Sequence, residues 1–122
     1  MHPVLQVALG GALGAVARYG VNLAGRRWPG FPVSTLTVNV LGSFVMGVLF
    51  VALTERGGMR VAPFLMTGVL GGFTTFSAFS LDAVALYEGG QPGMAALYVA
   101  ASVGLSLAAL IAGLALARGI FA

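Results

Sequence analysis

Hydroxyl and amide side chains lie inside stretches of the chain that are otherwise apolar, and these residues have the types that could contact a solute. Asn39 lies near the centre of the segment STLTVNVLGSF, with Thr35 about one helical turn before it and Ser43 one turn after it. On a helix these three side chains share one face. Polar groups in hydrocarbon must find a partner or line a wet path, so the stripe is a candidate pathway. An asparagine at this depth can equally bridge two helices, and the residues alone leave both interpretations open.

A second polar row occurs near the end of the chain, where Tyr98, Ser102 and Ser106 are spaced i, i+4 and i+8. This spacing aligns three hydroxyls along one face of a helix. Serine in a helix often donates to its own backbone carbonyl four residues earlier, which would leave no group for a solute. A row of three hydroxyls is more than this alternative requires, and it favours a polar track.

The stretch GGFTTFSAFSLD, residues 71 to 82, combines residues that weaken a helix with hydroxyls and phenylalanines. Its glycine and threonine half predicts a break near the middle of a membrane helix. A break frees backbone carbonyls, which hydrocarbon tolerates only where they bind something or face a cavity. Freed carbonyls suit a small hard cation, as they do in the unwound helices of transporters.

Phe76 and Phe79 follow this expected break and lie at i and i+3, on one face of a helix. Ordinary packing against lipid or a protein core explains most pairs of this kind. The functional alternative rests on the phenyl ring, whose edge is electropositive and can lie beside an anion.

Charged residues within the apolar segments are rare. Arg18 either extends its charged end to the nearby membrane surface or supplies a fixed positive charge at a pore mouth that concentrates an anion. Asp82 either pairs with Arg18 of a neighbouring subunit or is protonated. His2 is the single histidine, cysteine is absent, and no Ser/His/Asp set or metal-ligand cluster occurs, so the sequence argues against an enzyme.

Composition places these residues in a membrane. The chain has 122 residues, of which 59% are hydrophobic and 7% charged, whereas about 25% of residues are charged in a soluble domain. The positive charge comes from a few scattered arginines, which do not form a patch for nucleic acid.

We expect an all-α membrane protein whose 122 residues form a single four-helix transmembrane domain, since a crossing helix needs about 20 apolar residues. The expected spans are about 4–24, 33–53, 61–87 and 94–117. Four spans with tight loops put both termini on one side of the membrane. No basic region precedes the first apolar run, so we expect that run to remain as a span rather than act as a cleaved signal peptide.

The arginines give little orientation signal. Arg56, Arg60 and Arg118 lie on one side, and Arg26 and Arg27 on the other. Because an excess of Lys and Arg in short loops normally fixes orientation, a chain with so small a bias could insert both ways, or the translocon could still select one.

Glycine and small residues favour association between helices. Gly10–Gly14 and Gly68–Gly72 have the small-xxx-small spacing of close helix crossings, and the last span is rich in Ala, Gly and Ser. Four short helices hardly enclose a solute pathway alone. We therefore expect a homo-oligomer, most simply a homodimer in the lipid bilayer.

Three blocks, GGALGAVARY, TLTVNVLGSFVMG and GGFTTFSAFSLD, resemble the signature blocks of the Fluc (CrcB) family of bacterial fluoride channels, in order and in spacing. The resemblance implies a dual-topology, antiparallel homodimer in the bacterial inner membrane. It also implies two fluoride pathways for each dimer and passive, fluoride-selective export that reduces fluoride toxicity in the cytoplasm.

The resemblance also assigns roles to residues by position. It implies a central structural sodium ion held by backbone carbonyls of Gly71 and Thr74 at the break in the third helix. The residues that it implies along the fluoride pathway are Arg18, Asn39, Phe76, Phe79, Tyr98, Ser102 and Ser106. We expect Thr35 and Ser43 of the polar stripe to line this pathway as well. Three residues depart from the family pattern: Asp82 stands where a glutamate is expected, and Ser34 and Ala78 replace a glycine and a hydroxyl.

Two other functions compete with a fluoride channel. A small four-helix exporter of drugs or cations would share the length and the weak charge bias, but its coupling chemistry requires a carboxylate deep in the first span. Here that span carries Arg18 and no acidic residue. A membrane subunit without transport activity, in which Asn39 and the hydroxyls only join helices, is compatible with the sequence.

Overall fold

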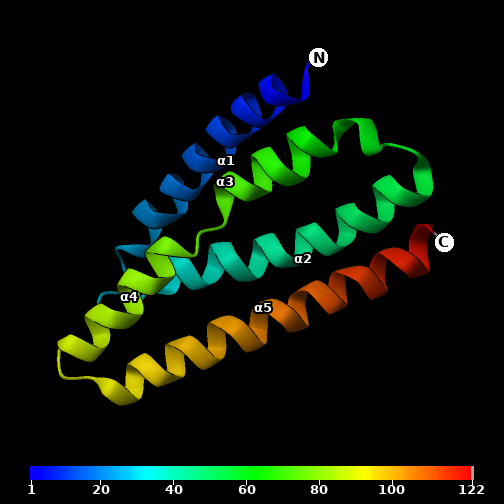
Figure 1. Ribbon diagram of the computed structural model, residues 1–122. Coiled ribbons are helices and arrows are strands. Elements are labelled where there is room, and N and C mark those ends of the chain that lie inside the picture. The colour runs from blue at the N-terminus through cyan, green and yellow to red at the C-terminus, as the bar shows by residue number, and fades with distance from the viewer. Residues whose placement is uncertain (122) are drawn as a thin grey trace.

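Helices account for nearly all of the chain in the computed structural model, which describes residues 1–121 (Figure 1). The first, second and last spans are each one helix, namely α1 (Pro3–Gly25), α2 (Val33–Arg56) and α5 (Pro92–Phe121). The third span is built from four successive pieces: η1 (Met59–Val61), η2 (Pro63–Leu70), α3 (Gly71–Phe73) and α4 (Ser77–Glu88).

Four helical segments of the described chain are long and apolar enough to cross a membrane: Pro3–Gly25, Val33–Arg56, Met59–Glu88 and Pro92–Phe121. The prediction of an all-α membrane protein with four spanning helices is therefore confirmed at this level. The observed helices extend beyond the expected bounds by a few residues at their ends. Both termini lie at the same end of the molecule, as an even number of spans requires (Figure 1).

Local sequence signals explain where the helices begin and end. Pro3 occupies the first turn of α1, and the ring nitrogen Nδ1 of His2 accepts a hydrogen bond from the backbone N–H of Val4 at 3.1 Å. Gly57 ends α2 in the left-handed conformation, with φ of 75°, which glycine adopts without steric cost. These signals give tight loops that bring successive spans together.

Two helix pairs approach closely enough that only glycine fits between them. In the first pair, α1 packs against η2 and α3. A Cβ atom on Gly68 would lie 2.9 Å from the Cα of Gly10, and one on Gly72 would lie 2.6 Å from the carbonyl oxygen of Gly11. A Cβ atom on Gly14 would collide with the carbonyl oxygen of Val69. The two small-xxx-small segments therefore face one another across this crossing.

The second close pair is formed by α2 and α5. A Cβ atom on Gly47 would lie 2.5 Å from the carbonyl oxygen of Leu110, and one on Gly113 would collide with the carbonyl oxygen of Phe44. Small residues at such crossings let helices gain van der Waals contact in lipid, where the hydrophobic effect does not drive association.

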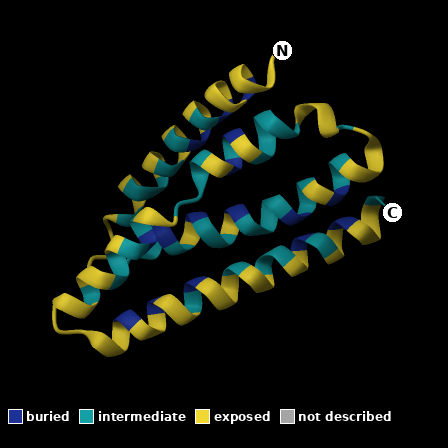
Figure 2. Ribbon diagram, viewed as in Figure 1, coloured by how far each residue is buried: buried dark blue, intermediate teal, exposed yellow. Residues whose placement is uncertain are grey.

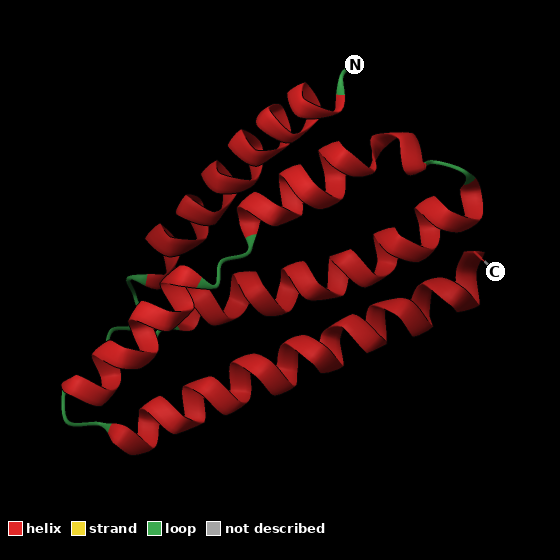
Figure 3. Ribbon diagram, viewed as in Figure 1, coloured by secondary structure: helices red, strands yellow, loops and turns green. Residues whose placement is uncertain are grey.

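Between α3 and α4 the backbone leaves helical geometry (Figure 3). Thr74 is extended, with φ of −86° and ψ of 158°, and α4 begins at Ser77. Before this point the third span packs against α1, and after it α4 packs against α5. The interruption thus transfers the span from one neighbour to another and leaves its polar backbone beside α2.

Few side chains are fully enclosed within one subunit. Val38 and Tyr98 are completely buried, whereas large apolar side chains are exposed along all four spans (Figure 2). Such apolar outer faces suit a bilayer, because lipid tails solvate them as well as a protein core would.

Candidate functional site

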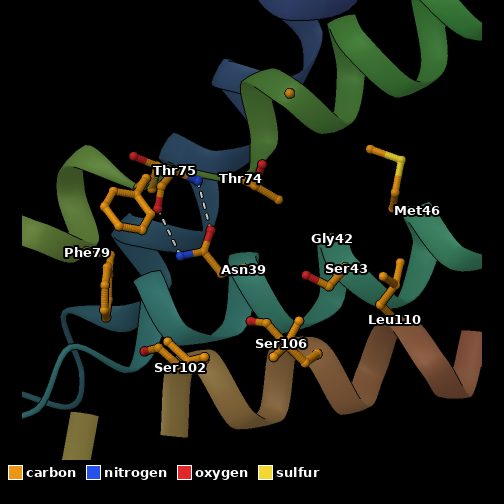
Figure 4. A pocket seen from close by; sticks show the side chains of 14 residues that line it. Asn39, Gly42, Ser43, Met46, Thr74, Thr75, Phe79, Ser102, Ser106 and Leu110 are labelled. Carbon is orange, nitrogen blue, oxygen red and sulfur yellow. Dashed lines mark hydrogen bonds between the residues drawn. The ribbon is translucent and has the colours of Figure 1, made fainter. Parts of the chain in front are cut away.

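A cavity of about 580 Å³ lies between α2, α5 and the interruption of the third span (Figure 4). Most residues that we expected at the site contribute to its lining: Asn39, Ser43, Gly71, Thr74, Phe76, Phe79, Ser102 and Ser106. Apolar side chains from α2 and α5, including Met46 and Leu110, complete its wall. The fold thus brings three separate polar segments of the sequence to one intramembrane space.

Three expected pathway residues do not line this cavity. Thr35 and Tyr98 are buried behind it, with 6% and 0% of their surfaces exposed. Arg18 is half-buried on α1, on the other side of the interruption. Any part that these residues take in a pathway is therefore indirect or lies outside the cavity.

Asn39 is bonded to the backbone of the interruption at both ends of its amide. Its Nδ2 donates to the carbonyl oxygen of Thr75 at 2.9 Å, and its Oδ1 accepts from the N–H of Thr75 at 2.8 Å (Figure 4). A primary amide carries two N–H groups, so one of them remains for a further partner. Asn39 does bridge two spans, and it still has a donor for a solute.

Arg18 reaches the same interruption from the opposite side. Its Nε donates to the carbonyl oxygen of Gly72 at 3.0 Å. This carbonyl lies at the C-terminal end of α3, where the helix dipole is negative and a cation is favoured. The guanidinium is therefore directed at the backbone of the third span within its own subunit.

Three carbonyl oxygens of the interruption remain without a donor. Within residues 1–121, Gly71, Phe73 and Thr74 receive no hydrogen bond at their carbonyl oxygens. Gly71 and Thr74 line the cavity, whereas Phe73 does not. Unpaired backbone carbonyls at membrane depth are tolerated only where they face such a space.

The start of α4 lies on the other side of the interruption. The hydroxyl of Thr75 accepts a hydrogen bond from the N–H of Ala78 at 3.2 Å, which caps the first turn of α4. The N-terminal end of a helix carries a partial positive charge and attracts anions. One break in one span therefore presents a carbonyl end suited to cations and an N–H end suited to anions.

Serine hydroxyls from α2 and α5 face the cavity opposite this helix end (Figure 4). The Oγ of Ser102 is buried and makes no hydrogen bond in the described part of the chain. It does not donate to its own helix, so the back-bonding alternative is wrong for this residue. The Ser102 side chain lines the cavity, while its Oγ atom is itself buried.

A column of four aromatic rings begins with Phe76 and Phe79 in the cavity lining and continues away from the cavity through Tyr98 and Phe31. The ring centroids of Phe76 and Phe79 lie 5.4 Å apart, those of Phe79 and Tyr98 lie 5.3 Å apart, and those of Tyr98 and Phe31 lie 5.6 Å apart. Phe76 and Phe79 meet edge to face, so at least one ring directs its electropositive edge along the column.

Asp82 has a partner within the subunit. The hydroxyl of Tyr98 donates to its Oδ2 at 3.1 Å. Arg18 contacts Gly72 and not Asp82 in the same chain. Asp82 and Phe31 also line a second cavity of about 430 Å³, so the buried Tyr98 lies between the two cavities.

We predict that Tyr98→Phe lowers the free energy of unfolding by about 1–2 kcal/mol, because it leaves the Asp82 carboxylate without its hydrogen-bond donor. Thermal unfolding in detergent measures the loss. Tyr87→Phe is the matched control, since Tyr87 is exposed near the end of α4 and its hydroxyl has no partner in residues 1–121. Equal effects of the two substitutions would contradict a stabilising Tyr98–Asp82 bond.

Besides the apolar wall of the cavity, two residues that make polar or aromatic contacts at the site were not among the predicted site residues. Thr75 supplies both the backbone partner of Asn39 and the cap of α4, and Phe31 packs on Tyr98 from the loop before α2. Thr75 lies inside the stretch for which we predict a break, so its hydroxyl could have been proposed as a helix cap. The position of Phe31 in the sequence gives no indication that its ring packs against Tyr98.

An all-helical chain with four spans and a donor-lined cavity inside the membrane belongs to the class of small channels and transporters. The family model described as "CrcB-like protein, Camphor Resistance (CrcB)" matches residues 5–114. The chain belongs to this family.

Relatives with assigned names agree with this membership. A protein named fluoride-specific ion channel FluC from Cereibacter sphaeroides is 68% identical over 118 residues, covering 95% of this chain and 94% of the relative. The protein of the same name from Paracoccus denitrificans is 62% identical over 122 residues, covering 99% of this chain and 98% of the relative. The one from Agrobacterium fabrum is 51% identical over 125 residues, covering 99% of this chain and 100% of the relative. These relatives are ion channels, which confirms that the chain is not an enzyme.

Proposed function

We propose that this protein is a fluoride-selective channel that lets fluoride leave the cytoplasm passively and so reduces its toxicity. The observation that carries the proposal is the donor-lined cavity at the interruption of the third span, in a chain whose relatives are named fluoride-specific ion channels. The expected location is the bacterial inner membrane, and the relatives compared above are bacterial.

Fluoride is small and strongly hydrated, so its passage requires donors that replace water. The free N–H of Asn39, the hydroxyls of Ser43 and Ser106, and the ring edges of Phe76 and Phe79 are such donors. The positive end of α4 adds an electrostatic attraction for the anion. Several moderate sites in succession admit the ion without trapping it, which conduction requires.

The carbonyl oxygens of Gly71 and Thr74 fit a structural sodium ion. They are backbone oxygens without a donor, they lie beside the cavity, and hard cations prefer oxygen ligands. Two such oxygens from each subunit would supply four ligands at the axis of a homodimer. When bound there, the ion would supply positive charge that holds the two interrupted spans together.

An antiparallel, dual-topology homodimer with two pathways agrees with two further features. The arginines give little orientation bias, as insertion in both directions requires. Phe76 has 77% of its surface exposed in one subunit although it lines the cavity, so a second subunit could cover it.

The proposal is tested by fluoride efflux from liposomes that contain the purified protein, with chloride as the control anion. We expect rapid fluoride efflux and no chloride efflux. Well-folded protein without fluoride flux would overturn the channel proposal and favour a membrane subunit without transport activity. Proton- or drug-coupled cation transport in the same liposomes would favour an exporter.

A further inference from the structure

We propose that Asn39 and Arg18 are positioning residues that determine which carbonyls of the interruption remain free for a cation. The inference rests on the proposed sodium site, and it adds a role for two side chains that do not themselves contact the ion. Both roles follow from where each donor and acceptor of residues 71–78 finds its partner.

In an uninterrupted α-helix each backbone N–H donates to the carbonyl four residues earlier. The N–H of Thr75 would then occupy the carbonyl of Gly71, and the N–H of Ala78 would occupy that of Thr74. Instead, Oδ1 of Asn39 accepts from Thr75 at 2.8 Å, and the hydroxyl of Thr75 accepts from Ala78 at 3.2 Å. The carbonyls of Gly71 and Thr74 are free because their helical donors are bonded elsewhere.

Two neighbouring carbonyls are bonded to side chains. Arg18 donates to Gly72 at 3.0 Å, and Nδ2 of Asn39 donates to Thr75 at 2.9 Å. The free carbonyls at 71 and 74 are thus each followed by an occupied one, at 72 and 75. The carbonyl oxygen of Phe73 also receives no hydrogen bond within residues 1–121, but Phe73 does not line the cavity, whereas Gly71 and Thr74 do.

The interruption is closely packed between α1 and α2. A Cβ atom on Gly42 of α2 would collide with the side chain of Thr74, and one on Gly14 of α1 would lie 2.8 Å from the backbone nitrogen of Phe73. The interruption therefore lies between two helices, each of which also supplies one of the two bonding side chains. Loss of either side chain frees a competing backbone group beside the cation site.

The test measures how sodium changes thermal unfolding of the purified protein in detergent, with potassium replacing sodium at constant ionic strength. We expect Asn39→Leu and Arg18→Met to raise the sodium concentration for half-maximal stabilisation about tenfold, since each lost hydrogen bond corresponds to a factor of up to about ten. Arg18→Lys keeps a donor and a charge and should restore most of the sodium response.

Thr37→Val is the matched control on α2, because the Thr37 hydroxyl is exposed and donates to the Val33 carbonyl of its own helix at 2.8 Å. It should leave the sodium response unchanged. Variants that lower the melting temperature equally at every sodium concentration would overturn the inference, because that result indicates structural support alone. Fluoride flux in liposomes is measured separately, so a channel without any sodium response would refute the cation site and leave the fluoride proposal intact.

A second measurement needs no variant, and it tests the proposed role of Asn39 even if the substituted proteins do not fold. Hydrogen exchange of the unmodified protein should show the Thr75 amide protected with and without sodium, because Asn39 and not the ion holds it. A Thr75 amide that exchanges as freely as an unbonded amide would overturn the inference.

Discussion

Phe79→Ile is expected to reduce fluoride flux about tenfold. A tenfold change corresponds to ~1.4 kcal/mol, which is near the upper end of the energy of an aromatic contact. Phe79 lines the cavity, has 9% of its surface exposed, and contacts the rings of both Phe76 and Tyr98. Isoleucine keeps an apolar side chain of similar bulk but removes the electropositive ring edge. Fluoride efflux from liposomes, compared at equal amounts of reconstituted protein, measures the change.

The same substitution at Phe76 should act in the same direction, since its ring also lines the cavity. Phe50→Ile is the control, because Phe50 is exposed on α2 and lies outside the cavity lining. Size-exclusion chromatography must show the same oligomer for all variants. Unchanged flux in both Phe76→Ile and Phe79→Ile would remove the phenylalanines from the pathway.

Gly14→Ala should lower the free energy of unfolding by about 3 kcal/mol, the upper end of the usual cost of overpacking. The added methyl group collides with the carbonyl oxygen of Val69 and lies 2.8 Å from the backbone nitrogen of Phe73. Both are backbone atoms that cannot rotate away, so α1 must move off the third span. Thermal unfolding in detergent and the yield of monodisperse protein report the loss.

Gly20→Ala supplies the matched control on the same helix. A Cβ atom on Gly20 meets no atom of the subunit within 4 Å, and alanine favours helix more than glycine does. This variant should be as stable as the unmodified protein or more so. If both alanines were equally well tolerated, close packing of α1 on the third span would not be a source of stability.

The four spans were predictable because the bilayer acts on single segments. A stretch of apolar residues must become a helix in hydrocarbon, whatever its neighbours are, since its backbone groups have no other partners. The i, i+4 spacing of Ser102 and Ser106 likewise predicts a shared helix face from the pitch of the helix alone. The apolar composition of a segment therefore determines that it spans the membrane, and the spacing of its polar residues determines which side of the helix is polar.

The partners of those polar faces were not predictable, because they depend on which helices cross and at what distance. The sequence leaves Asn39 as either a helix bridge or a solute donor, and the fold makes its amide bridge to Thr75 while one N–H stays free. The hydrogen bond from Arg18 to Gly72 was likewise not predictable, because 54 positions separate the two residues and no local sequence pattern links them.

The stretch from Gly71 to Asp82 shows both kinds of information. Its glycines and threonines indicate by themselves that a helix is weak there, because that is a property of local backbone preference. Which carbonyls stay unpaired, and that Asp82 meets the hydroxyl of Tyr98, follow only from side chains that α1, α2 and α5 bring to it. Local sequence thus determines the elements, and close helix crossings, built on glycine, decide the contacts that form the site.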